Sequence, residues 1–231
     1  MKMSRKTRLI SALDLPELDQ ALAMVDRIGG AVEWYKVGKQ LFTHYGPQVV
    51  RELKARGKKV FLDMKFHDIP NTVANAIRSG ALIGGDIIDV HASGGPAMLA
   101  AAAEAMRETG AKVIGVTVLT SMDQAQLEAI GISATPQEQV LRLAHLVGDA
   151  GLSGVVCSAL ELPMLRKEMG EEFLTVVPGI RPAGVSAGDQ KRIMTPRQAK
   201  EAGADFIVVG RPILADPEPA EAAARILQEL A

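Results

Sequence analysis

Short apolar runs alternate along the chain with longer segments of helical periodicity. The runs are almost continuously apolar and lack the in–out alternation of a half-solvated sheet, which is typical of parallel strands buried on both faces. Eight strands are predicted: Arg8–Ala12, Trp34–Val37, Val60–Met64, Ile87–Val90, Val113–Val118, Gly154–Cys157, Leu174–Val177 and Phe206–Val209. Eight helices are predicted between and after them: Leu15–Ile28, Pro47–Arg56, Asn71–Ile83, Pro96–Thr109, Pro136–Ala150, Ala159–Met169, Pro196–Ala202 and Pro217–Leu230.

This strict alternation predicts one α/β domain over residues 1–231, built as a (β/α)8 TIM barrel. A doubly wound open sheet is the alternative, because periodicity does not distinguish the two architectures. No linker or low-complexity segment divides the chain. Two longer irregular stretches, Thr120–Thr135 and Arg181–Thr195, each follow a predicted strand. Long loops in such places usually carry function.

Composition narrows the class of protein. The 231 residues have a formal net charge of −1 and only 3% aromatic residues, which argues against nucleic-acid and membrane-surface partners. The single cysteine, Cys157, excludes an internal disulfide and suggests a reducing compartment. No apolar run approaches the roughly 18 residues of a membrane span. We expect a cytoplasmic protein.

Charged residues gather at the ends of the first three predicted strands. Asp14, Lys36, Asp63, Lys65 and Asp68 supply three carboxylates and two ammonium groups, and barrel enzymes place their reactive groups at these ends. At about 4 Å and an effective dielectric of about 20, one Asp–Lys pair contributes roughly 4 kcal/mol of Coulomb energy. A structural ring of ion pairs is the alternative interpretation. Five such groups on three successive strand ends favour a reactive site with a positioned proton donor.

The loops after the last two strands resemble a phosphate site. Barrels often bind phosphate there, through free backbone N–H groups and arginine. These loops supply Gly179, Arg181, Gly184, Gly188, Gln190, Gly210 and Arg211. Any one of these glycines is more simply an ordinary turn residue, but a Gly-Arg pair in both loops predicts a phosphorylated ligand.

Metal and nucleotide cofactors are not indicated. His67 and His91 are candidate ligands, but no set of His, Asp and Glu has ligand spacing. Cys157 is expected in the core, and no glycine-rich nucleotide-binding loop is present. The residues alone therefore predict proton transfer or carbon–carbon cleavage by Lys and Asp on a phosphorylated small molecule.

The stretch from Asp63 to Thr72, D-M-K-F-H-D-I-P-N-T, strongly resembles the orotidine 5′-phosphate decarboxylase family. Five further segments match in order: Leu13-Asp14, Tyr35–Gly38, Val118–Ser121, Pro178–Arg181 and Val209–Pro212. The resemblance covers nearly the whole chain and is similar to the bacterial single-function form.

This resemblance implies a carboxy-lyase that converts orotidine 5′-phosphate to UMP and CO2, the last step of de novo pyrimidine synthesis. It implies a homodimer that uses no cofactor and no metal. Lys65 corresponds to the proton donor to C6 of the pyrimidine, and Asp63 to the residue beside the substrate carboxylate. Asp68, with Thr72 near it, is expected to enter the site of the partner subunit.

The remaining roles also come from the resemblance. Asp14 and Lys36 would hold ribose hydroxyls, and Thr120 or its neighbour Ser121 would contact the pyrimidine. The phosphate would be held by Arg181, Gln190, Gly210 and Arg211. The loop 181–195 is expected to close over it.

Two other functions fit parts of the pattern. Sugar-phosphate decarboxylases and hexulose-phosphate synthases share D-x-K-x-x-D but use magnesium, whereas the continuation from His67 to Thr72 favours the pyrimidine enzyme. A non-catalytic barrel that binds a phosphometabolite would not need the set of Lys36, Asp63, Lys65 and Asp68.

Overall fold

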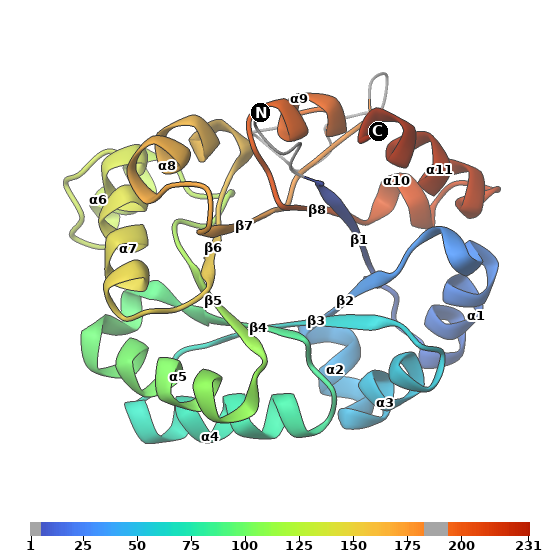
Figure 1. The fold of residues 1–231 in the computed structure, drawn as a ribbon, viewed down its shortest axis with the longest axis horizontal. Helices are drawn as coiled ribbons and strands as arrows, with labels where there is room; N and C mark the ends of the chain where they lie inside the picture. The colour runs from blue at the N-terminus through green and yellow to red at the C-terminus, as the bar shows by residue number, and fades with distance from the viewer. Residues whose placement is uncertain (1–5, 183–193) are drawn as a thin grey trace.

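The computed structural model describes residues 6–182 and 194–231. Its eight strands are all parallel and form one closed barrel in chain order (Figure 1). The strands are β1 (Arg8–Ala12), β2 (Trp34–Gly38), β3 (Lys59–Phe66), β4 (Ile87–His91), β5 (Lys112–Val116), β6 (Gly154–Val156), β7 (Leu174–Val177) and β8 (Phe206–Val209). The (β/α)8 prediction is confirmed, and the open sheet is excluded by the pairing of β1 with β8.

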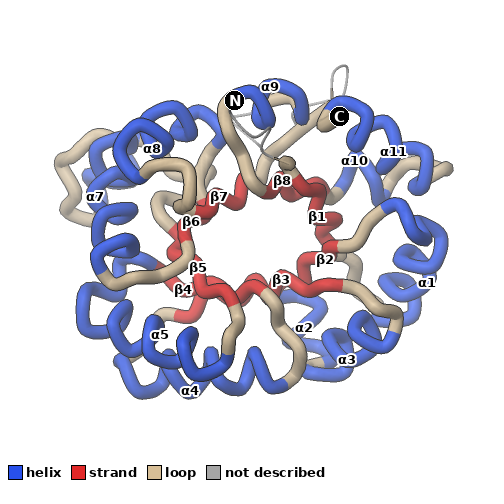
Figure 2. The backbone as a smooth tube through the Cα atoms, in the orientation of Figure 1, coloured by secondary structure: helices blue, strands red, loops and turns tan. Residues whose placement is uncertain are grey.

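Helices surround the barrel on its outside (Figure 2). The α-helices in the described ranges are α1 (Leu18–Ile28), α2 (Lys39–Tyr45), α3 (Pro47–Ala55), α4 (Pro70–Leu82), α5 (Gly95–Thr109), α6 (Gln124–Ala129), α7 (Pro136–Asp149), α8 (Leu162–Met169), α9 (Pro196–Glu201), α10 (Arg211–Leu214) and α11 (Pro219–Glu229). Short 3-10 turns occupy Gly29–Ala31, Ala92–Gly94 and Ala159–Glu161.

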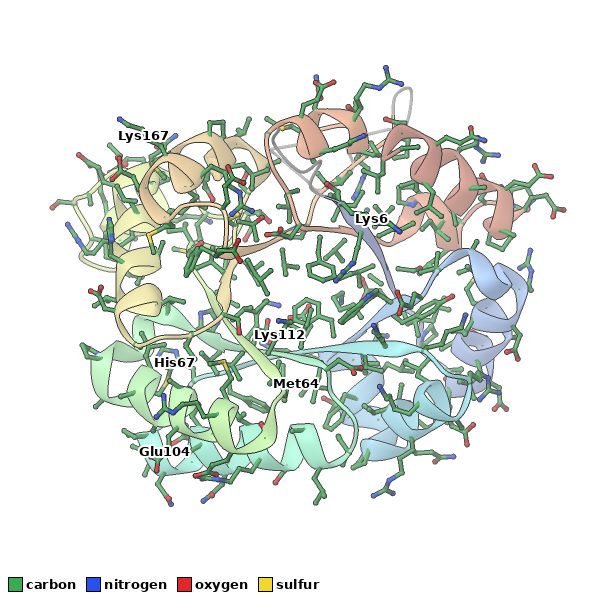
Figure 3. The ribbon with its side chains drawn as sticks, viewed as in Figure 1. Lys6, Met64, His67, Glu104, Lys112 and Lys167 are labelled. Carbon is green, nitrogen blue, oxygen red and sulfur yellow. The ribbon has the colours of Figure 1, made fainter. Side chains whose placement is uncertain are left out.

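The apolar runs are continuous because both faces of each strand are buried. Ile10 and Phe61 point into the barrel, where they join a small inner cluster. Their neighbours Leu9 and Leu62 point outward and pack in the larger layer between sheet and helices. The opening that the ribbon leaves at the centre holds the inward side chains (Figure 3). Burial on both faces is the expected environment of a parallel sheet.

The structure corrects several predicted elements. Three short helices, α2, α6 and α10, were not predicted, and α6 lies inside the stretch Thr120–Thr135 that we expected to be irregular. Helix α1 begins at Leu18 rather than Leu15. Asn71 is not the N-cap of α4, because Pro70 already occupies the first turn and Ile69 is the cap residue. Proline suits that first position because its ring fixes a helical φ and it has no N–H to satisfy.

Because all strands run the same way, their carboxyl ends meet at one mouth of the barrel. Reactive side chains of barrel enzymes lie at this mouth. No helix in the described part of the chain combines the length and apolarity that crossing a bilayer requires.

Candidate active site

A row of alternating charges lies across the ends of β1, β2 and β3. Lys36 Nζ is 2.9 Å from Asp14 Oδ1 and 3.3 Å from Asp63 Oδ2. Asp63 Oδ1 in turn accepts a hydrogen bond from Lys65 Nζ. The predicted convergence of these four residues is therefore confirmed, since each carboxylate or ammonium contacts a neighbour of opposite sign.

The middle of this row is withdrawn from solvent. The side chains of Lys36 and Asp63 are 11% and 13% exposed, whereas that of Asp14 is 59% exposed. Burial alone would lower the pKa of Lys36, but the carboxylates of Asp63 and Asp14 outweigh it and raise that pKa. Burial would raise the pKa of Asp63, but the two ammonium groups lower it to about 2. Both groups are therefore charged at neutral pH.

Gly38 makes room for the first ion pair. A Cβ atom there would lie 2.8 Å from Lys36 Nζ and 3.3 Å from Asp14 Oδ1. A side chain at this position would therefore push the ammonium away from its partner. The absence of a side chain lets Lys36 lie across the end of its own strand.

The backbone of β3 is irregular where it presents Asp63 and Lys65. The β3–β4 register shifts between Leu62 and Phe66. Lys65 has a φ of 52°, the one positive φ at a non-glycine residue in the described ranges. This conformation costs an L-amino acid about 1–2 kcal/mol, and such strain is concentrated at functional sites. The bulge changes the direction of the Lys65 side chain, as bulges beside active sites commonly do.

Sequence reasoning missed Asp89, which contacts this bulge from β4. Its Oδ1 accepts the backbone N–H of Lys65 at 2.7 Å, and its side chain is fully buried. The signal was present in the sequence, because Asp89 interrupts the apolar run Ile87–Val90. A carboxyl inside a buried strand is costly unless other groups contact it.

The charged row forms one wall of a cavity of about 180 Å³. Lys36, Asp63 and Lys65 line it on the side of β2 and β3. Apolar side chains line the rest, contributed by β3, by β5 to β8 and by segments that follow strands: Phe61, Val116, Val118, Leu119, Val156, Cys157, Val176, Pro178 and Val208. Thr120 also lines the cavity, as its predicted role requires, and Cys157 is buried as expected. Charged groups facing an apolar wall interact more strongly than they would in water.

The predicted phosphate residues lie at the ends of β7 and β8. Arg181 follows β7 and is 8% exposed, and its Nη1 donates to the carbonyl of Ile180 at 2.9 Å. Gly210 is the cap residue of α10, and a Cβ there would lie 3.6 Å from Asp14 Oδ2. Arg211 begins that helix and is exposed. Gln190, and most of the loop 181–195, lie outside the described residues.

Asp68 and Thr72 do not join the cavity of their own chain. Asp68 is exposed in the turn before α4, where its Oδ1 accepts the N–H of Ile69 at 2.7 Å. Thr72 is exposed in the first turn of α4. A separate surface depression lies beside Asp68, lined by His67, Asp68, Ile69, Pro70, Gly94, Ala97 and Met98. Within one chain, these two residues are therefore separate from the charged row.

His67 and His91 lie side by side near the site, with ring centroids 5.4 Å apart. Burial, together with the positive charges of His67, Lys39 and Lys65, lowers the pKa of His91 to about 4. No group of three or more His, Cys, Asp and Glu side chains able to hold a metal ion occurs in residues 6–182 and 194–231.

The lowered pKa predicts a pH dependence of stability. The folded state holds the His91 proton less tightly than the unfolded state, so stability is lost as the pH falls from about 6.5 toward 4. Partial exposure of the ring reduces the effect to about 1 kcal/mol between pH 7 and pH 5. His91→Gln should therefore lose less stability over that interval in urea unfolding. His145→Gln, at an exposed position of α7, is the matched control. An equal pH slope in wild type and His91→Gln would contradict the assignment.

The chain is similar to known proteins over nearly its whole length. The family model described as orotidine 5′-phosphate decarboxylase / HUMPS family matches residues 7–226. The orotidine 5′-phosphate decarboxylase of Vibrio campbellii is 52% identical over 227 residues, 97% of each chain. That of Nitrosococcus oceani is 50% identical over 97% of this chain and 98% of its own. The crystal structure of orotidine 5′-phosphate decarboxylase from Lactobacillus acidophilus matches with a TM-score of 0.86 and 38% identity, covering 97% and 99% of the two chains.

Proposed function

The chain belongs to the orotidine 5′-phosphate decarboxylase / HUMPS family, and we propose that it converts orotidine 5′-phosphate to UMP and CO2. This makes it a carboxy-lyase of pyrimidine biosynthesis, with residues 1–231 as one decarboxylase domain acting in the cytoplasm. The observation that carries the proposal is the row of Lys36, Asp63 and Lys65 against an apolar-walled cavity. Relatives named orotidine 5′-phosphate decarboxylase match nearly the whole of this chain.

In the proposed reaction the bond between C6 of the pyrimidine and its carboxylate breaks. The electron pair stays on C6, and CO2 leaves. The ammonium of Lys65 stabilises the developing negative charge and gives a proton to C6, and it later regains a proton from water. A fixed cation directed at developing charge is among the strongest catalytic devices available to a protein. No electron acceptor or further reactant is needed for the atoms to balance.

Asp63 is proposed to lie beside the carboxylate of the bound substrate. Its carboxylate keeps Lys36 and Lys65 on either side of it, so the two ammonium groups are fixed before substrate enters. Such preorganisation removes the cost of orienting the proton donor during the reaction. Asp14 and Lys36 would bind the ribose hydroxyls, and Thr120 the pyrimidine.

Arg181, Gln190, Gly210 and Arg211 are proposed to bind the phosphate. Arg181 and Arg211 follow β7 and β8, where barrels commonly bind phosphate. Binding energy from the phosphate, far from C6, can hold the substrate in the reactive arrangement. The enzyme is further proposed to be a homodimer in which Asp68, with Thr72 near it, completes the site of the partner subunit. Exposure of both residues outside their own cavity supports this assignment.

Ultraviolet absorbance with orotidine 5′-phosphate tests the function directly. Purified protein with EDTA present should convert the substrate to UMP, because the proposed steps use only side chains of the chain. A folded protein that leaves orotidine 5′-phosphate unchanged would contradict the proposal. The family model also covers the HUMPS enzymes, so turnover of a sugar phosphate that EDTA abolishes and Mg²⁺ restores would instead assign that activity.

A further inference from the structure

Asp89 occupies a position in the barrel interior that an apolar residue would ordinarily fill. It follows Ile87 by two residues on β4, so both side chains point to the same face. Ile87 belongs to the inner apolar cluster, and Asp89 is 0% exposed. Burying a carboxyl here is unfavourable unless neighbouring polar groups contact it. In the part of the chain that the structure describes, the polar contacts of the Asp89 side chain lie on one segment of β3.

That segment is the bulge that carries the reactive residues. Leu62 pairs with Ile88, and Phe66 pairs with Val90. Three residues of β3, from 63 to 65, therefore lie opposite Asp89 alone. The regular ladder cannot supply an acceptor for every N–H of a bulged strand. The side chain of Asp89 supplies one, since its Oδ1 accepts the N–H of Lys65 at 2.7 Å.

The second oxygen of Asp89 faces the reactive side chains. Oδ2 is 3.8 Å from Lys65 Nζ, and it accepts no hydrogen bond within residues 6–182 and 194–231. Burial, and then the nearby charge of Asp63, raise the pKa of Asp89 well above its usual range. Its carboxyl therefore holds a proton more tightly than a free carboxyl does, and in the protonated form it donates a hydrogen bond to the Asp63 carboxylate.

We propose that Asp89 is a positioning residue for the decarboxylation. Its carboxyl connects the backbone N–H of Lys65 to the carboxylate of Asp63 and thereby holds Lys65 in the left-handed conformation that directs its ammonium into the cavity. The inference rests on the proposed function, in which Lys65 is the proton donor. Asp89 itself does not line the cavity, so it acts through Lys65 and Asp63 rather than on the substrate.

Two substitutions separate the hydrogen bonds of Asp89 from its ability to ionise. Asp89→Asn keeps an acceptor for Lys65 and a donor for Asp63, and its kcat should stay within about fivefold of wild type. Asp89→Ala removes both, and displacement of Lys65 should lower kcat by about 100-fold. UMP affinity, measured by calorimetry, should change less than about threefold in either variant, because the phosphate contacts are distant.

Asp86 offers a matched control on the same strand pairing. Its Oδ2 accepts the N–H of Val60, also on β3, at 2.7 Å. It does so at the opposite end of the barrel, away from the cavity. Asp86→Ala should lower the thermal midpoint while leaving kcat near wild type. A purely structural Asp89 would behave in the same way, so the contrast in kcat distinguishes positioning from packing.

Three results would overturn the proposal in a wild-type enzyme that turns over its substrate. They are an equal loss of kcat in Asp89→Asn and Asp89→Ala, a loss in Asp89→Ala no larger than in Asp86→Ala, and a parallel loss of UMP affinity. If Asp89→Ala does not fold, Asp89→Val also removes the acceptor and suits a buried strand. An inactive wild type would instead contradict the proposed function. In that case, a crystal structure of Asp89→Ala or Asp89→Val in which Lys65 keeps its positive φ would by itself overturn the positioning role.

Discussion

Lys65→Ala is expected to lose about four orders of magnitude in kcat, because in the proposed reaction this one residue supplies both the stabilising charge and the proton. The carbanion at C6 would form opposite an apolar wall with its nearest ammonium removed. Affinity for UMP should change little, since the product carries no charge at C6 and its phosphate is proposed to bind at the ends of β7 and β8. Stopped-flow absorbance and calorimetric binding of UMP measure the two quantities separately.

The fold of this variant should survive. Asp63 loses one partner but keeps Lys36 at 3.3 Å, so its buried carboxylate remains paired. Lys59→Ala is the matched control, because Lys59 lies on the same strand at the opposite end and pairs with Glu33 on the surface. It should leave kcat unchanged. Turnover near the wild-type rate in Lys65→Ala would remove Lys65 from its proposed role.

Mixing two inactive variants is expected to restore activity if Asp68 serves the partner subunit. In a dimer of Lys65→Ala with Asp68→Ala, one site contains both substitutions and the other contains neither. Random exchange should therefore give about a quarter of wild-type turnover, since about half of the dimers are mixed and each has one intact site. The gain over either variant alone should exceed about 100-fold. Absorbance assays before and after subunit exchange measure it.

The control for this experiment pairs two residues of the same wall. Lys65 and Asp63 contact each other within one chain, so mixing Lys65→Ala with Asp63→Asn leaves every site defective and should restore nothing. Native mass spectrometry shows whether mixed dimers have formed. Mixed dimers without recovered activity, or a protein that stays monomeric, would exclude a site shared through Asp68.

The parts of this molecule that sequence predicts best are those set by a local pattern. The strands β1, β7 and β8 have the predicted bounds because each is a short apolar run with clear ends. The convergence of Asp14, Lys36 and Asp63 could be predicted from the sequence, because the carboxyl ends of parallel strands meet at one mouth of a barrel. The short helices α2 and α10, with seven and four residues, are too brief to give a periodic signal.

The features that sequence did not predict depend on pairing between segments. Alternation alone places Asp63 and Lys65 on one face, but it does not show the register shift against β4 or the positive φ of Lys65. Asp89 acquires its role only through that shift, because it then faces three residues instead of one. The proposed place of Asp68 in the site of a partner subunit comes from the family resemblance, because no local pattern encodes a contact with a second copy of the chain.

The alternating signs of the charged row also limit the distance over which it acts on an approaching anion. Lys36 and Lys65 each have a carboxylate of the row in contact. Seen from beyond the screening length of about 8 Å at physiological ionic strength, these charges largely cancel. An approaching anion therefore interacts with the separate charges of the row only at close range. Lys36 and Lys65 thus act on a molecule that has already entered the cavity, and not on one that is still in solution.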